Sequence, residues 1–219
     1  MQLSNVTLEI LKNFSSINNN LIINPGNQLV TISNQKNIMA KAEVLETFPS
    51  QFGIYSLPEF LGAVSLFTEP ELTFEEKCVL ISSGKNAVKF FAADPSLLTV
   101  VPTIKAIPEP DITFDLDKSV LSFIMKSSNI LNVPDFSIVG NGAEICVMVG
   151  DKSNQTSNVF KSTIGETDKT FRFNMKIENL KVIKESYELS IAAKKMCKLT
   201  GKVLPIEYYI ALENDGSME

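Results

Sequence analysis

Histidine is absent from this sequence of 219 residues, and arginine occurs once, as Arg172. Because most acid–base and nucleophilic catalysis near neutral pH uses a histidine, its absence excludes Ser-His-Asp and Cys-His catalytic arrangements. It also excludes zinc sites that need a histidine ligand. The three cysteines, Cys78, Cys146 and Cys197, are far apart and form no close pair. This spacing indicates buried, reduced thiols of a cytosolic protein rather than a metal site.

The sequence also lacks any uninterrupted apolar run of about 18 residues, the length that a transmembrane helix needs. Residues 1–5 contain no basic region followed by an apolar stretch, so no secretory signal is expected. We therefore expect no membrane association and a cytoplasmic location. The formal net charge of −5 argues against a protein that grips nucleic acid with its whole surface.

Apolar residues make up 44% of the chain, which is enough for one large domain or for two domains of about 110 residues each. In the first half, apolar residues at helical spacing predict a helix over 4–18 and a second helix that starts at Ser56. Ser4 and Ser56 are the expected N-caps. Short strands are predicted at 21–23, 29–33, 38–44, 72–74, 78–82 and 87–92.

The middle of the chain carries prolines at positions 95, 102, 108 and 110, which indicates an extended connector between two domains. We place these domains at 1–108 and 109–219. After the connector, Asp115 is predicted to cap a helix that runs to about residue 132, and a short helix is predicted near 178–184. The strands expected in this half lie at 135–139, 144–149, 158–164, 170–174, 187–192, 197–203 and 206–212, with a hairpin turn at Asn141-Gly142.

The second half repeats motifs of the first half in the same order. The pattern of residues 52–61 recurs 119 positions later, in residues 171–180. The motif at 10–12 recurs 114 positions later, and the motif at 88–91 recurs 118 positions later. Three matches with nearly the same offset indicate an internal duplication.

The predicted architecture is therefore α+β, with two similar domains that each pack two helices on antiparallel sheet. A chain of two like domains can bind head-to-tail to copies of itself. Such contacts close into a ring when the rotation between copies fits. The residues do not decide between a ring of two chains and a ring of three.

Several short motifs resemble the sliding clamps of T-even-type bacteriophages. They lie in the same order along most of the chain, at Leu3-Ser4, Leu11-Lys12-Asn13-Phe14, Ile17-Asn18, Ile54-Tyr55, Phe60-Leu61-Gly62, Ser65-Leu66, Ala92-Ala93-Asp94-Pro95-Ser96 and Ala211-Leu212-Glu213. The segment 208–211 also resembles the end of eukaryotic clamps, whereas the loop at 151–157 diverges.

The resemblance implies a DNA clamp fold and a homotrimeric ring that encircles double-stranded DNA without sequence specificity. Such a ring tethers the replicative DNA polymerase as a processivity factor, with no enzymatic activity and no cofactor. The implied partners are the C-terminal peptide of the polymerase and an ATP-driven clamp loader. In this family the clamp also helps to activate late transcription.

A ring that slides needs weak attraction to phosphate, which lysine provides as a mobile point charge on a flexible stem. Lysines on the predicted helices, away from the apolar stripes, are expected to face the DNA. These residues are Lys12, Lys118, Lys126, Lys181 and Lys184. The alternative is that they are ordinary solvent-exposed lysines.

The resemblance implies two further surfaces. Partner peptides would insert beneath the connector and beside the C-terminal strand, at Ile104, Ile107, Pro108, Tyr208, Ile210 and Leu212, unless these residues only fill the core. Subunits would join through strand edges, unless the strands are interior ones. The edge residues would be Ala87, Val88 and Phe90 of one chain and Asn158, Phe160 and Ser162 of the next.

Two other classes of function stay open. A structural or scaffold phage protein would share the β-rich pattern and the lack of catalytic groups. A hydrolase or transferase would need a carboxylate or cysteine site, and none converges in the sequence. Asp111, Asp115 and Asp117 could attract a cation, but capping by Asp115 and a favourable position of Asp117 at the helix N-terminus explain two of them, so no metal is expected.

Overall fold

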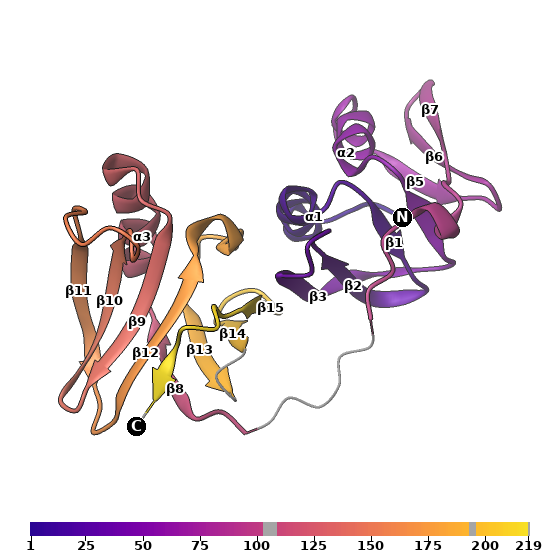
Figure 1. Cartoon of the computed structure of the whole chain (residues 1–219). Helices are drawn as coiled ribbons and strands as arrows, with labels where there is room; N and C mark the ends of the chain where they lie inside the picture. Colours follow the sequence, from indigo (N-terminus) through magenta and orange to yellow (C-terminus); the bar gives the residue numbers. More distant parts are fainter. Residues whose placement is uncertain (103–108, 193–195, 219) are drawn as a thin grey trace. The chain divides into compact units, whose positions relative to one another are not determined.

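The chain divides into two compact units in a computed structural model that describes residues 1–102, 109–192 and 196–218 (Figure 1). Unit 1 comprises residues 1–103 with 204–206, and unit 2 comprises residues 104–203 with 207–219. Each unit combines few helices with antiparallel strands, as the sequence predicts. The predicted boundary between residues 108 and 109 borders residues outside the described ranges and stays a prediction.

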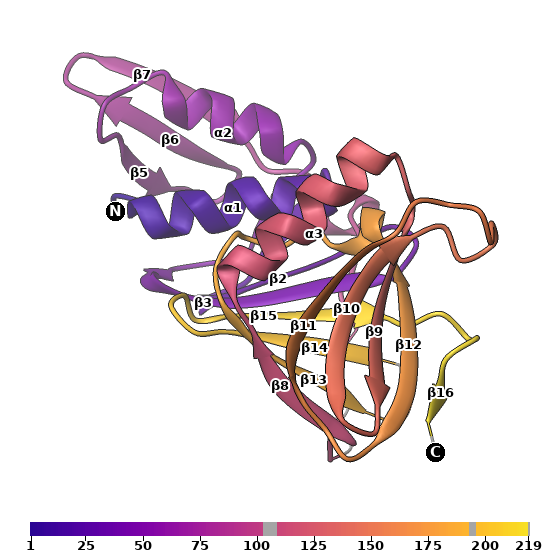
Figure 2. The same ribbon diagram turned by 90° about the vertical axis from the view of Figure 1, so that its left-hand side faces the viewer.

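Unit 1 is built around two helices that pack against each other, α1 (Asn5–Ile17) and α2 (Leu57–Ser65) (Figures 1 and 2). Both predicted N-caps are confirmed. The Ser4 hydroxyl accepts a hydrogen bond from the Thr7 N–H at 3.2 Å, and the Ser56 hydroxyl accepts one from the Glu59 N–H at 3.4 Å. The apolar stripe of α1, which includes the fully buried Phe14, covers one face of the neighbouring strands.

The strands of unit 1 form short antiparallel pairings. β1 (Leu21–Ile23) pairs with β4 (Phe52–Ile54), and β2 (Gly26–Ile32) pairs with β3 (Ile38–Phe48). β5 (Glu71–Phe74), β6 (Cys78–Ser83) and β7 (Asn86–Phe91) form a three-stranded sheet in that order, followed by the 3-10 turn η1 (Pro95–Leu97).

Unit 2 begins with β8 (Ile112–Leu116) and the helix α3 (Lys118–Leu131). A five-stranded antiparallel sheet has the order β11-β10-β9-β12-β16. Its strands are β9 (Asp135–Asn141), β10 (Glu144–Gly150), β11 (Phe160–Glu166), β12 (Thr170–Lys176) and β16 (Ser217–Met218). α3 packs on β10 and β11. Gly142 adopts φ +82° in the β9–β10 turn, which confirms the predicted hairpin.

The other strands of unit 2 are β13 (Tyr187–Ala192), β14 (Met196–Gly201) and β15 (Ile206–Ala211). β15 pairs with β14, β14 pairs with β13, and β13 pairs with β8. Tyr187 and Tyr208 meet edge to face in the core, with ring centroids 5.9 Å apart. Ile183 lies between them, since its N–H donates to the Tyr208 hydroxyl oxygen and its carbonyl accepts from Tyr187.

The predicted duplication is confirmed by the order of elements. α1, β1–β4 and β5–β7 of unit 1 correspond to α3, β9–β12 and β13–β15 of unit 2. The recurring motifs fall on corresponding elements, with residues 52–54 on β4 and residues 171–173 on β12. Even β8 has a counterpart, because Met1 and Leu72 exchange two backbone hydrogen bonds where β8 would pair with β13.

Two local predictions are wrong. The helix expected near 178–184 is only the 3-10 turn η2 (Ile177–Asn179), so unit 2 has one α-helix among its described residues. Asp115 does not cap a helix, because it lies in β8 and pairs in register with Glu188. The N-cap of α3 is Asp117, whose side chain makes no capping hydrogen bond.

Candidate functional site

The lysines predicted to face DNA are all exposed, and three of them lie on the α-helices. Lys12 is on α1, and Lys118 and Lys126 are on α3. Among the described residues, none of these three forms an ion pair, whereas five other lysines do. Their charge is therefore available to a phosphate group without the loss of an internal partner.

Lys181 and Lys184 are exposed but do not lie on a helix. They follow η2 in an irregular stretch that leads to β13. Leu180 and Ile183 are both buried, and the hydrogen bonds of Ile183 to the two tyrosines anchor the chain there without a second helical turn. These two lysines thus lack the rigid helical support that the sequence predicts for them.

β7 is an edge strand, since within the described residues it pairs only with β6. The Ala92 N–H donates to the Lys77 carbonyl at 2.9 Å, which sets the alternation along this ladder. The backbone groups of Ala87, Lys89 and Phe91 consequently point away from β6. This row of donors and acceptors is open to a further strand.

The side chains of β7 alternate between the two faces of the strand. Val88 and Phe90 are half-buried, and the Phe90 ring meets Phe60 of α2 edge to face at 5.3 Å. Ala87 and Phe91 are exposed, and the Phe91 side chain is 66% accessible. Phe91 is not among the contact residues predicted for this edge, because a phenylalanine in a strand is more often buried.

β11 is likewise an edge strand of its sheet and pairs only with β10 among the described residues. Of the residues expected at this edge, Phe160 and Ser162 lie on β11, whereas Asn158 precedes it. The Phe160 ring stacks on Phe123 of α3, with centroids 6.3 Å apart. Phe123 remains 58% exposed, so an aromatic surface borders the open edge. Nothing in the sequence indicates this pair, because its two residues are far apart along the chain.

The residues predicted to form a partner pocket cannot all be placed. Ile104, Ile107 and Pro108 lie outside the described residues. Tyr208 and Ile210 are fully buried in β15, and Leu212 is nearly so. Next to them, burial and a hydrogen bond to Glu207 raise the pKa of the Tyr209 hydroxyl far above its usual range. The described part of the predicted pocket thus consists of side chains that also pack the core of unit 2.

Neither a metal centre nor a membrane segment emerges from the described structure. Across residues 1–102, 109–192 and 196–218, no three Cys, Asp or Glu side chains come together as a metal site. Asp115 instead pairs with Lys202 at 2.5 Å. None of the helices in the same ranges is long and apolar enough to cross a bilayer.

Comparison with known proteins identifies relatives over nearly the whole chain. A family model described as DNA polymerase processivity factor matches residues 3–85, and one described as gp45 sliding clamp, C terminal, matches residues 113–214. The sliding clamp of Vibrio phage KVP40 is 31% identical, over 97% of this chain and 99% of the relative. The sliding clamp of Enterobacteria phage T4 is 28% identical, over 99% of each chain.

Solved structures show the same fold at low identity. The A. fulgidus PCNA bound to the C-terminal region of FEN-1 superimposes with a TM-score of 0.74 at 12% identity, covering 99% of this chain and 98% of that one. The two-unit α+β architecture is therefore the DNA clamp fold. Together with the family matches on both halves, this shows that the chain belongs to the phage sliding clamps, the processivity factors of DNA polymerase.

Proposed function

We propose that three copies of this chain join head-to-tail into a closed ring that encircles duplex DNA and holds the replicative polymerase on its template. The observation that carries the proposal is the doubled architecture, with an open strand edge at β7 in unit 1 and at β11 in unit 2. A head-to-tail contact joins unlike edges, so every copy can repeat it until the ring closes. Retention then comes from topology, and the ring needs no catalytic group.

The open edges supply the subunit contact in this proposal. β7 of one copy would pair with β11 of the next, so that the exposed backbone groups of Ala87, Lys89 and Phe91 gain partners. Val88 and Phe90, with Phe160 and Ser162 on the other side, would support the joint from within each unit. Asn158 would sit at the end of the contact, just before β11 begins.

DNA contact is assigned to Lys12, Lys118 and Lys126, with Lys181 and Lys184, which lie outside the helices, as further contributors. Phosphate contacts by lysine carry no sequence information, which suits a ring that must move along any sequence. The net charge of −5 does not conflict with this assignment, because only the inner surface has to be positive.

The C-terminal peptide of the polymerase is proposed to dock at Tyr208, Ile210 and Leu212, together with the connector residues Ile104, Ile107 and Pro108. An ATP-dependent clamp loader would open and close the ring through the same neighbourhood. A role as coactivator of late transcription would use the ring as a mobile platform on DNA. These three roles rest on family membership.

The first test is the mass of the assembly in solution. Analytical ultracentrifugation should give a closed species of three chains, whereas a monomer or an open polymer would contradict the ring and favour a structural phage protein. Phe91→Asp should shift the distribution towards monomer, because it places a charge at the proposed joint. Leu66→Asp is a matched control, since Leu66 is 68% exposed but lies at the end of α2.

The second test is stimulation of a related phage polymerase on primed circular DNA, with its loader and ATP. The double variant Lys12→Glu/Lys126→Glu should lose most of this stimulation while keeping its trimeric mass. Lys36→Glu, which changes an exposed lysine in the β2–β3 turn, is the control for net charge. Unchanged activity of the double variant would remove these lysines from the DNA-facing surface.

A further inference from the structure

A hollow lies on the face of the five-stranded sheet that is turned away from α3. Residue alternation defines this face, because Phe160 and its partner Val149 lie on the α3 side, whereas Ser137, Met148 and Arg172 lie on the other. The hollow is shallow and open to solvent, and the empty space in and above it is about 280 Å³. Its lining consists of Asp135, Ser137, Met148, Gly150, Asp151, Lys152, Val159 and Arg172.

Three of the four charged residues in this lining already have charged or strongly bound partners. Lys152 pairs with Asp215 at 2.6 Å, and the buried Asp135 pairs with Lys176 at 2.6 Å. Asp151 accepts hydrogen bonds from the N–H and the hydroxyl of Ser153, which lower the pKa of its carboxyl group. Their charges are therefore largely satisfied.

Arg172 is the exception. Its Nε–H donates to the Asn174 side-chain oxygen at 3.2 Å, and one Nη donates to the Ser137 hydroxyl at 3.5 Å. No carboxylate of the described residues lies within ion-pair distance of the guanidinium, which is exposed in β12. Among the described residues, the positively charged guanidinium of Arg172 therefore has only neutral hydrogen-bond partners in the hollow.

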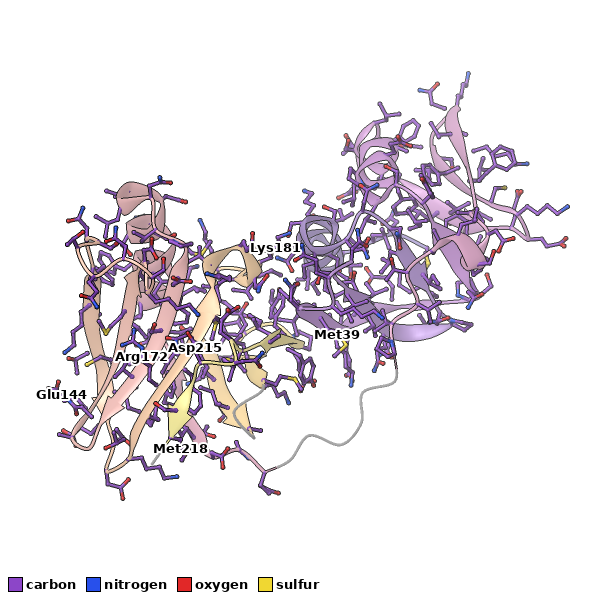
Figure 3. The ribbon with its side chains drawn as sticks, in the orientation of Figure 1. Met39, Glu144, Arg172, Lys181, Asp215 and Met218 are labelled. Atoms are coloured by element: carbon purple, nitrogen blue, oxygen red, sulfur yellow. The ribbon has the colours of Figure 1, made fainter. Side chains whose placement is uncertain are left out.

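The partners of Arg172 fix the direction of its guanidinium. Ser137 and Asn174 are only 4% and 3% exposed, and the Ser137 hydroxyl donates to the Asn174 oxygen at 2.7 Å. Asn174 is held in turn by Asp215, which accepts from its amide at 3.0 Å. Arg172 and Asp215 are both labelled in Figure 3. This chain secures the side of the guanidinium that carries Nε. The end with the two Nη groups keeps free N–H donors in a planar fork.

A planar pair of N–H donors matches the two oxygens of a carboxylate, and lysine cannot reproduce that geometry. Nineteen of the twenty cationic residues in this chain are lysines, and Arg172 is the one arginine. Beside it lie the Met148 side chain and the 52% exposed Val159, which offer an apolar contact. A carboxylate joined to an aliphatic side chain would satisfy both features.

We propose that this hollow is a docking site for the carboxylate of a partner peptide, with Arg172 as the specificity-determining residue. The site lies wholly within unit 2 and differs from the proposed polymerase pocket at β15. It goes beyond the ring function and does not depend on it. A partner held here would leave the pocket at Tyr208 free for another protein.

The single arginine makes a direct test possible, because its Nε–H gives one side-chain NMR signal that needs no assignment. The full chain is labelled at arginine Nε and at the methionine methyl groups, with Met148 identified through Met148→Leu. The probe is acetyl-Leu-Ser-Leu with a free C-terminal carboxylate. The Arg172 and Met148 signals should shift together and saturate, and the peptide amide should bind at least about tenfold more weakly.

The Met148 methyl signal also measures peptide binding in variants of Arg172. Arg172→Gln should weaken peptide binding about tenfold or more, and Arg172→Lys should fall between it and the native chain. Lys161→Gln is the matched control, because it removes a charge from the same face of the sheet outside the hollow and should leave binding within about twofold. The signal of the native Arg172 itself keeps the test valid if a variant is misfolded.

The proposal is overturned if no saturable shift occurs, if the amide binds as well as the acid, or if Arg172→Gln binds normally. Titration with inorganic phosphate separates the remaining possibility. Saturation by phosphate without a response to the peptide would assign the hollow to a phosphorylated or nucleic-acid ligand instead of a carboxylate.

Discussion

Units 1 and 2 share one order of elements but differ in their second helix. α2 has nine residues, whereas its counterpart η2 has three. The N-cap of α2 is Ser56, and the residue 119 positions later is Met175, which is buried in β12. A methionine cannot accept the hydrogen bond that a serine accepts from the first helical turn. In unit 2 the capping side chain is missing and the adjoining strand is longer, and both features disfavour a full helix there.

The helices also differ in charge. α1 carries Glu9 and Lys12, and α2 carries Glu59 and no lysine. α3 carries Lys118 and Lys126 and no acidic residue. Positive charge on helices is thus concentrated in unit 2, so the two halves of each chain should contribute unequally to any contact with phosphate.

The largest expected effect concerns a core position that differs between the units. Phe14 of α1 is fully buried, and the residue 114 positions later in α3 is Ser128, whose hydroxyl donates to the Val133 carbonyl at 2.8 Å. Phe14→Ala should lower the free energy of unfolding by about 3–5 kcal/mol, because it leaves a cavity. Ser128→Ala should cost only about 1 kcal/mol. Urea unfolding, with hydrogen exchange to separate the units, measures both, and equal losses would contradict the comparison.

The N-termini of α1 and α3 should respond differently to loss of their acidic residues. Glu46 accepts from the Ser4 N–H and from the Thr7 hydroxyl, whereas Asp117 makes no side-chain capping bond. Glu46→Gln should therefore destabilise unit 1 by about 1–2 kcal/mol, and Asp117→Ala should destabilise unit 2 by less. Thermal unfolding of the two variants measures both losses of stability. A larger loss from Asp117→Ala than from Glu46→Gln would contradict the prediction.

The same contrast predicts a pH dependence. Burial raises the pKa of Glu46, but the hydrogen bonds from Thr7 and Ser4 outweigh it and lower the pKa below its usual value. Stability from this group is therefore fully present above the ordinary glutamate pKa of about 4.3 and is lost as the pH falls through the lowered folded-state value. Glu46→Gln should remove this part of the acid sensitivity of α1 in exchange measurements. If the pH dependence of hydrogen exchange in α1 is the same in Glu46→Gln as in the native chain, the prediction is wrong.

The charge difference between the helices predicts unequal roles for their lysines. Lys126→Glu should lower polymerase stimulation roughly threefold at moderate salt, and Lys12→Glu should have a smaller effect because Glu9 already offsets that charge. The assay is stimulation on primed circular DNA across a salt series. A larger loss of polymerase stimulation from Lys12→Glu than from Lys126→Glu would contradict a greater role for the lysines of unit 2.

The smallest effect is expected at the two chain ends. The hydrogen bond from Lys152 and that from Asn174 lower the pKa of Asp215, so the C-terminal anchor is present above the usual aspartate pKa and lost as the pH falls through the lowered one. Asp215→Asn should cost a few tenths of a kcal/mol, because the pair is largely solvated. Glu71→Gln, which alters the 3.8 Å contact with the N-terminus, should change nothing measurable. Hydrogen exchange of residues 216–218 reports the first effect.

Much of this fold could be predicted from local patterns. Ser4, Ser56 and the Asn141-Gly142 turn fix element boundaries through short-range chemistry, and the duplicated motifs point to two like units. Family motifs then made the clamp fold predictable. The prediction of a helix near 178–184 was wrong. The apolar residues there have helical spacing, but the pairing of β12 and the hydrogen bonds of Ile183 to the two tyrosines determine the backbone conformation instead.

The candidate surfaces were predicted less completely than the fold. Edge position is a property of the whole sheet, so Phe91 and the Phe123–Phe160 stack could not be recognised from neighbouring residues. The hollow at Arg172 depends on three strands, β9, β10 and β12, and on the loop between β10 and β11, which meet only after folding. The sequence alone does not tell whether a carboxylate will lie within ion-pair distance of Arg172 in the folded chain.

Lys89 affects which strands can pair with the open edge of β7. Its ammonium group lies 3.6 Å from Glu75 and 5.7 Å from the centre of the Phe91 ring, at the middle of the exposed row. Two β7 edges that met antiparallel about this residue would place two like charges opposite each other, which disfavours a symmetric pair. The lysine therefore disfavours twofold association and fibre growth through this edge.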